Sequence, residues 1–460
     1  MSAVTDASGG PVALARRFPP DFAFGAATAA YQIEGAVADD GRGPSIWDTF
    51  SHTRGRTRNG ETGDVACDHY HRWRSDLDLM AELGLRAYRF SIAWPRVQPE
   101  GRGPVNQAGL DFYDRLVDGL LERGIEPWLT LYHWDLPQAL QDAGGWTDAS
   151  LADRLAEYAG IVAGRLGDRV GRWITLNEPR THAFIGHAVG RHAPGGHGWA
   201  NGLRAAHHLH LAHAAAVRAI RTVAPEARIG VCHDVAHVIP ASQSVDDAGA
   251  ARRHDGAMHR WFLDPTFGRG YPSDMVEWYS SNGLLEGLDL AAVAGAEPID
   301  FLAVNYYRRE RIADVPVTPD WGIGSSVLSG VGESTGNGWE VWPDGLRAVL
   351  SRIQAEYGTI ELAVTENGAT YPDAIGADGS VEDAERRSYL ARHVAALADA
   401  RDDGVPVNAY FVWSLLDNFE WGEGYGARFG IVHVDFPTQR RTVKSSGRWY
   451  QELLGAADAR

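Results

Sequence analysis

The chain has 460 residues, of which 44% are hydrophobic and 22% charged, a composition typical of a globular protein that buries a large core. Its 60 acidic residues outnumber 43 basic ones and give a net charge of −17, which argues against nucleic acid or an anionic membrane as a partner. No stretch approaches 18 uninterrupted apolar residues, so the sequence predicts no membrane span.

Both ends of the chain are predicted to be tails. Residues 1–17 contain Gly9, Gly10 and Pro11 and lack the apolar run of a signal peptide, so we expect a disordered tail and a cytoplasmic protein. Residues 456–460 are expected to form a short tail as well, which leaves residues 18–455 as a single domain. Cys67 and Cys232 lie in unrelated segments and are expected to be buried free thiols.

Segments typical of strands and of helices alternate along the chain. The strand candidates are apolar in their middles without strict alternation, which is expected of strands buried on both faces. They are residues 22–35, 85–94, 126–134, 172–178, 227–234, 300–307, 361–366 and 407–413.

Amphipathic helices are predicted between these strands. Phe112, Leu116 and Leu120 recur at a spacing of four, and Gly124 marks the end of that helix. Further helices are predicted at residues 72–83, 151–166, 202–223, 344–357, 382–403 and 446–454. Eight strands, each followed by helical sequence, predict an α/β fold, a (β/α)8 TIM barrel in one domain with long βα loops. The irregular stretch 308–342 is expected to be a loop over the barrel mouth.

Polar and aromatic side chains gather at the carboxyl ends of the predicted strands. These ends meet at one mouth in a (β/α)8 barrel, so distant residues share a pocket there. Two carboxylates, Glu178 and Glu366, end the fourth and seventh strands, which face each other across the opening. Two carboxyl groups about 5–5.5 Å apart suit retaining glycoside hydrolysis, with one as nucleophile and the other as acid/base. The other strand-end residues are Gln32, Glu34, Arg89, His133, Trp134, Asp135, Asn177, Asn305, Tyr306, Tyr307, Asn367, Trp413, Asp417, Glu420 and Trp421.

Seven motifs in this order resemble glycoside hydrolase family 1, and within it the bacterial β-glucosidases. They are FAFGAATAAYQIEGA (22–36), RFSIAW (89–94), TLYHWDLPQ (130–138), TLNEP (175–179), NYY (305–307), VTENG (364–368) and WSLLDNFEW (413–421). The resemblance implies that residues 18–455 form the catalytic domain of a retaining exo-β-glucosidase that needs neither metal nor organic cofactor. Its implied substrates are small β-glucosides or cello-oligosaccharides, with a role in cellulose degradation.

The resemblance also implies a role for each motif residue. Glu366 matches the nucleophile, Glu178 the acid/base, and Asn177 the contact to the sugar 2-hydroxyl, while Arg89 and Tyr307 match donors to the nucleophile. Trp339 matches the platform for the leaving group. The matching sugar-binding residues are Gln32, His133, Trp134, Asn305, Trp413, Glu420, Trp421 and Phe429.

Arginines depart from the family pattern on the leaving-group side of the site. Arg180 follows TLNEP, where the family often has an aromatic residue, and Arg308 and Arg309 follow NYY, where it often has a small hydroxyl residue. These departures leave the preferred leaving group open. They do not change the expected reaction.

Three other interpretations remain. A broad β-glycosidase would also accept galactosides or fucosides, and a transglycosidase would pass the sugar to an acceptor other than water. A non-catalytic sugar-binding module is disfavoured because both carboxylates are present. His207, His210 and His213 recur at helical spacing without an acidic ligand between them, which favours a structural histidine face over a metal site.

Overall fold

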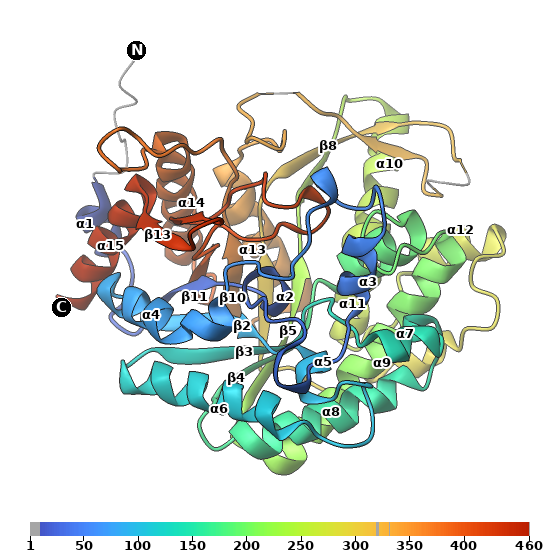
Figure 1. Ribbon diagram of the computed structural model, residues 1–460. Helices are drawn as coiled ribbons and strands as arrows, with labels where there is room; N and C mark the ends of the chain where they lie inside the picture. Colours follow the sequence, from blue (N-terminus) through green and yellow to red (C-terminus); the bar gives the residue numbers. More distant parts are fainter. Residues whose placement is uncertain (1–9, 319–321, 331, 460) are drawn as a thin grey trace.

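The computed structural model describes residues 10–318, 322–330 and 332–459 (Figure 1). Eight parallel strands form a closed barrel in the order β1-β11-β10-β7-β5-β4-β3-β2, which confirms the (β/α)8 prediction. The barrel strands are β1 (Ala23–Ala27), β2 (Ala87–Ser91), β3 (Glu126–Tyr132), β4 (Arg172–Asn177), β5 (Arg228–Asp234), β7 (Phe301–Asn305), β10 (Glu361–Asn367) and β11 (Val407–Trp413).

Helices surround the barrel and bury their apolar faces against it (Figure 1). The larger ones are α4 (His69–Glu82), α6 (Gln107–Glu122), α8 (Leu151–Leu166), α9 (Trp199–Val223), α10 (Val245–Asp255), α12 (Ser273–Ser281), α13 (Pro343–Tyr357), α14 (Ala384–Asp402) and α15 (Ser445–Asp458). Short helices in the connections are α2 (Ala30–Ile33), α3 (Ile46–His52), α5 (Trp94–Val97), α7 (Gln138–Asp142) and α11 (Trp261–Thr266). None of the helices in the described ranges has both the length and the apolar character that a membrane crossing needs.

Aromatic side chains fill the barrel interior. The ring of Trp128 on β3 lies 5.4 Å from that of Phe301 on β7 and 4.9 Å from that of Phe411 on β11. Gly25 and Gly230 make room for them, since a Cβ would lie 2.6 Å from the Phe411 ring at position 25 and 2.8 Å from the Phe301 ring at position 230. The barrel is therefore a packed core, and its open end lies at the carboxyl ends of the strands.

Two predicted segments differ from the structure near the mouth. The first predicted strand ends eight residues early, because β1 stops at Ala27 and the chain turns into α2, which carries Gln32. The stretch 308–342, predicted to be irregular, contains β8 (Arg309–Asp314) and β9 (Ser325–Val327), which form a small sheet with β6 (His237–Pro240). Strand β8 pairs outside the barrel, and its charged sequence RERIAD lacks the apolar run by which the barrel strands were recognised.

The predicted tails are also partly wrong. Helix α1 (Gly10–Ala15) buries Leu14 and Ala15 against the rest of the protein, so the part of the predicted tail from residue 10 onward is ordered. At the other end, α15 continues to Asp458. The apolar surface of α1 was too small to predict a helix from the sequence, because α14 and α15, which cover it, lie at the other end of the chain. Residues 1–9 and 460 of the predicted tails lie outside the described residues.

A buried network of ion pairs holds the segment after β11 in place. Lys444, the one lysine of the chain, is fully buried and donates to Asp417 Oδ1 at 2.6 Å and to Asp373. Arg428 donates to the other Asp417 oxygen at 2.7 Å. The predicted strand-end residue Asp417 is therefore held in the scaffold and does not face the mouth with Glu420.

Candidate active site

The two predicted catalytic carboxylates lie where the strands leave regular pairing. The β4–β5 register shifts between Ile174 and Asn177, just before Glu178, and the β10–β7 register shifts between Val364 and Glu366. Such irregularities redirect side chains at barrel rims. Glu178 itself has a φ of 44°, a left-handed conformation that costs a non-glycine residue roughly 1–3 kcal/mol. The fold therefore places these side chains away from their most relaxed strand geometry.

Glu366 is buried between two donors. Arg89 Nη1 on β2 donates to its Oε1, and Tyr307 Oη donates to its Oε2 at 2.5 Å. Arg89 is fully buried, and its Nη2 also donates to Asn177 Oδ1 at 2.5 Å. Both carboxylate oxygens thus have a donor, which favours the charged form of Glu366.

Glu178 is tied to the same cluster through Asn305. The Asn305 amide donates to Glu178 Oε1 at 2.7 Å, and its carbonyl oxygen accepts from Thr365 Oγ1 at 2.8 Å, next to Glu366. Arg89 contacts Glu366 and the residue before Glu178. The cluster therefore brings β4 and β10 together although β7 and β5 separate them in the barrel.

The surroundings of Glu366 change its protonation. Burial raises the pKa of Glu366 to about 7, Arg89 and Tyr307 act against this rise, and the Glu178 carboxylate adds to it. Glu366 therefore exchanges its proton near neutral pH.

His133 has a defined hydrogen-bonding role. Asn177 Oδ1 accepts from Arg89 and from Asn305, so the Asn177 amide nitrogen is the donor to His133 Nε2, at 2.9 Å. Burial lowers the pKa of His133 well below its ordinary value, which makes the ring neutral. Its Nδ1 therefore carries the proton and remains available as a donor.

A second polar group lies at the ends of β1 and β11. Gln32 Nε2 donates to Glu420 Oε2 at 3.2 Å and to Asn418 Oδ1 at 3.0 Å, and Gln32 Oε1 is buried without a partner in the described part of the chain. Burial raises the pKa of Glu420 to about 8, and Glu366 adds to the rise, which indicates that the two carboxyl groups are close. The rings of His133 and Trp413 are nearly parallel, 6.1 Å apart.

Aromatic rings surround these polar groups. The Trp421 ring lies 4.8 Å from that of Trp134, and both residues have positive φ. On the opposite side, the Trp339 ring lies 5.3 Å from that of Tyr307 and 6.1 Å from that of Phe429. The mouth is thus bordered by flat apolar faces next to hydrogen-bonding groups, a combination suited to a sugar ring.

Sequence reasoning missed some supporting residues and included others that are structural. Thr365 and Asn418, which position Asn305 and Gln32, lie within the quoted motifs but were not singled out. Glu34, a strand-end candidate, is instead held by Arg96 Nε at 3.0 Å and by the Tyr113 hydroxyl at 2.6 Å. Position in a motif was a usable signal for the first two residues, but the partners of Glu34 could be identified only in the fold.

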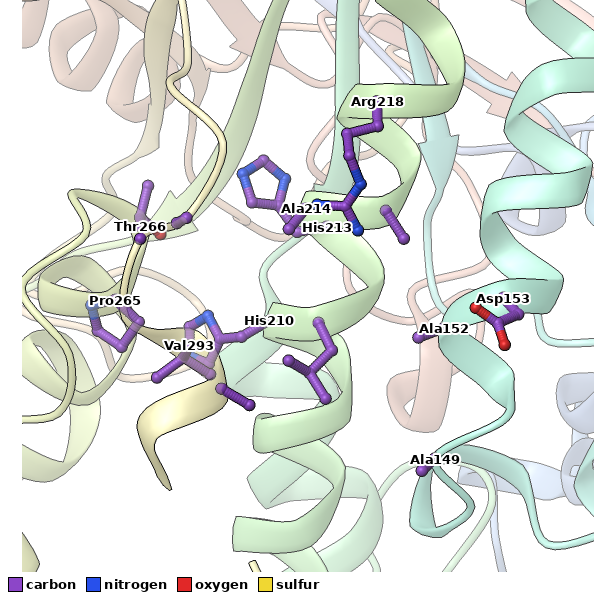
Figure 2. A pocket seen from close by; sticks show the side chains of 15 residues that line it. Ala149, Ala152, Asp153, His210, His213, Ala214, Arg218, Pro265, Thr266 and Val293 are labelled. Carbon is purple, nitrogen blue, oxygen red and sulfur yellow. The ribbon is translucent and has the colours of Figure 1, made fainter. Parts of the chain in front are cut away.

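The histidine face lies away from the mouth. His207, His210 and His213 are buried, and each has a hydrogen-bond partner within the protein. His210 and His213 line a cavity of about 300 Å³ between α8, α9 and the segment around Val293 (Figure 2). The described part of the chain holds no group of three or more histidine, cysteine, aspartate or glutamate side chains placed to bind a metal. Cys67 and Cys232 are buried and free, as expected.

Comparison with known proteins agrees with this geometry. "Beta-glucosidase A" of Thermotoga maritima is 46% identical over 442 residues, which cover 95% of this chain and 98% of the relative. A "Bifunctional beta-D-glucosidase/beta-D-fucosidase" of Bifidobacterium breve is 45% identical, covering 96% of this chain and 99% of the relative. A solved "Family 1 b-glucosidase from Thermotoga maritima" superposes with a TM-score of 0.92 at 45% identity, covering 96% of this chain and 98% of the other. The sequence model of Glycosyl hydrolase family 1 matches residues 14–458, and the chain belongs to this family.

Proposed function

We propose that the protein is a retaining exo-β-glucosidase that releases terminal non-reducing β-D-glucosyl residues from β-glucosides and cello-oligosaccharides. The observation that carries the proposal is the cluster at the mouth, in which Arg89 and Tyr307 hold Glu366 while Asn305 holds Glu178. A family relative named as a β-glucosidase at 46% identity supports the same activity.

The reaction follows from the two carboxyl groups. Glu366, ionised, attacks the anomeric carbon while Glu178 gives its proton to the leaving oxygen, and a glycosyl-enzyme forms. Glu178 then takes a proton from water, which attacks the same carbon and releases the sugar with its original configuration. Asn177 lies between Arg89 and His133 and contacts the 2-hydroxyl. This chemistry requires neither a metal nor an organic cofactor.

The remaining polar groups fit glucose hydroxyls. Gln32 Oε1 is an acceptor without a partner among the described residues, His133 Nδ1 is a donor, and Glu420 offers oxygens beside Gln32. The faces of Trp413 and Trp421 would pack on the C–H surface of the pyranose. These groups provide both the polar and the apolar contacts that a pyranose ring presents.

A broader β-glycosidase is the second candidate. It is favoured by the Bifidobacterium breve relative, whose name includes β-fucosidase activity. Rates of hydrolysis of nitrophenyl β-glucoside, β-galactoside and β-fucoside by one preparation would rank the two candidates. A transglycosidase would be recognised by oligosaccharide products at high substrate concentration.

The decisive experiment replaces the nucleophile. Glu366→Ala should abolish hydrolysis of 4-nitrophenyl β-glucoside, and added azide should restore release of nitrophenol with an α-glucosyl azide as product, since azide attacks from the side that Glu366 occupied. Glu385→Ala, an exposed carboxylate at the start of α14, is the matched control and should retain activity. Hydrolysis by Glu366→Ala at a rate near that of the unmodified protein would refute the assignment.

Two further parts of the proposal have separate tests. A role in cellulose degradation predicts glucose release from cellobiose and longer cello-oligosaccharides, one residue at a time from the non-reducing end. A cytoplasmic location is tested by fractionating the producing cells and assaying aryl β-glucoside hydrolysis in each fraction.

A further inference from the structure

Four arginines gather on the side of the mouth where the leaving group must lie. The leaving oxygen receives its proton from Glu178. The leaving group therefore extends past Glu178 toward the ends of β4, β5 and β7, opposite Gln32 and Glu420, which follow β1 and β11 in the chain. Arg180 lies two residues beyond Glu178, and Arg308 follows Tyr307 directly. Arg309 and Arg311 come from the adjoining strand β8.

Arg308 forms one surface together with Trp339. Its guanidinium carbon lies 4.7 Å from the centre of the Trp339 ring, and its side chain is 22% exposed. Its Nε and Nη2 both donate to Glu310 Oε1, while Nη1 has no partner among the residues described. Arg308 therefore presents an N–H edge next to an indole face at the border of the sugar site.

Each of the four arginines has a carboxylate partner. Arg180 is paired with Asp234, Arg308 with Glu310, and both Arg309 and Arg311 with Glu340, so four guanidinium groups face three carboxylates. Glu310 is also bonded by His254 Nε2 at 3.0 Å, which takes up its second oxygen. Glu178 is a fourth carboxylate, because it acts on Arg180, so the charges balance and the Nη1 edge of Arg308 is the donor that faces a ligand beside Trp339.

The pKa values of two buried members agree with this arrangement. Burial lowers the pKa of Arg180 to about 10, Glu310 acts against this shift, and Arg308 adds to it. Burial opposes ionisation of Glu310, but Arg308 and His254 outweigh it and hold the pKa of Glu310 well below its ordinary value. Arg180, Arg308 and Glu310 are thus near enough to act on one another, as one charged border to the site.

We propose that Arg308, stacked on Trp339, gives the enzyme a preference for β-glucosides whose aromatic leaving group carries a carboxylate. The ring would pack against Trp339, and the carboxylate would accept from Arg308 Nη1 in a partly buried, charge-assisted hydrogen bond. Arg180 would support the binding by its charge alone, because its Nε and Nη2 are engaged by Asp234 and its Nη1 lies against Met258 Sδ. This inference rests on the proposed function, since it names the leaving group of the same reaction.

The test compares two leaving groups of the same shape. Values of kcat/KM are measured for 4-carboxyphenyl and 4-carbamoylphenyl β-D-glucoside, and the ratio of the two is compared between proteins, so that any general loss of activity cancels. Arg308→Gln should lower the carboxy-to-carbamoyl ratio about 10- to 100-fold, the range expected when a hydrogen bond to a charged group is lost. Arg180→Gln should lower it by a smaller factor. Arg347→Gln, an exposed arginine paired with Asp403 on the outside, is the matched control and should leave the ratio unchanged.

A second measurement uses the unmodified protein. Raising the salt concentration from about 20 mM to about 500 mM should lower the ratio, because screening weakens attraction to the carboxylate and leaves the carbamoyl compound unaffected. A ratio that responds neither to salt nor to Arg308→Gln overturns the inference, even if 4-nitrophenyl β-glucoside is hydrolysed with a burst of nitrophenol. Failure to hydrolyse any aryl β-glucoside would overturn the proposed function itself, and the inference with it.

Discussion

Removal of the Tyr307 hydroxyl should shift the pH dependence of the enzyme. Tyr307 donates to Glu366 Oε2 at 2.5 Å, and Glu366 is only 3% exposed, so Tyr307→Phe leaves a buried carboxylate oxygen without this donor. A hydrogen bond to a charged group contributes about 1.5–3 kcal/mol, which corresponds to roughly one to two pKa units. The donor lowers the pKa of Glu366, so its loss must raise that pKa further above about 7.

The sign of the effect on activity follows from the mechanism. The nucleophile acts only when it is ionised, so kcat/KM declines as the pH falls through the pKa of Glu366. In Tyr307→Phe this acidic limb should move to higher pH by about one to two units, and kcat/KM at pH 7 should fall roughly 5- to 50-fold, because half of Glu366 is ionised at pH 7 when its pKa is about 7. The assay is hydrolysis of 4-nitrophenyl β-glucoside from pH 5 to 9, with stopped samples read at one alkaline pH.

A matched control separates this effect from the loss of any tyrosine hydroxyl. Tyr357 also donates to a carboxylate, Asp264 Oδ1 at 2.6 Å, but on the outside of the barrel on α13. Tyr357→Phe should leave the acidic limb in place. The reasoning would be refuted if Tyr307→Phe kept the limb of the unmodified enzyme, or if both variants moved it equally.

Two other substitutions test the surroundings of the site. Asn305→Ala removes the donor to Glu178 Oε1, so kcat/KM should fall about 10-fold or more for 4-methoxyphenyl β-glucoside. The loss should be much smaller for 2,4-dinitrophenyl β-glucoside, because its leaving group needs no proton. An equal loss for both substrates would count against a role in acid catalysis. Lys444→Met leaves Asp417 and Asp373 without their shared cation and should cost about 3–5 kcal/mol in urea unfolding at pH 7. Burial opposes ionisation of Asp417, but Lys444 and Arg428 lower its pKa, so the stabilisation they give is lost as the pH falls. The loss of unfolding free energy in Lys444→Met should therefore be smaller in acid. A loss that grows in acid would contradict this account.

Much of the fold could be predicted because its signals are local. The middles of the barrel strands are continuous apolar runs. All eight predicted strands begin within two residues of an observed strand, and all but the first also end within three residues of it. Strand β8 was missed because its pairing with β6 depends on a loop geometry that no local pattern encodes. Helix α1 was missed because Leu14 is buried only by contact with helices more than 350 residues away.

The sequence predicted which residues lie together at the mouth, but not how they bond to one another. Resemblance named Glu178, Glu366 and Arg89, and the structure gathers them at one mouth. Which groups bond to which could not be predicted. The proton of His133 lies on Nδ1 because Arg89 and Asn305 both donate to Asn177 Oδ1, and Glu34 is kept out of the site by its bond to Arg96. Hydrogen-bond partners depend on distances of tenths of an ångström, which spacing along a chain does not encode.

The solitary lysine has a practical consequence. Acylating reagents that attack amines find no lysine side chain on the folded surface, because the one ε-amino group lies fully buried between two aspartates. Acylation of Lys444 therefore requires that the region joining β11 to α15 opens. The rate at which that single position becomes acylated would report the frequency of this opening, with no background from other lysines.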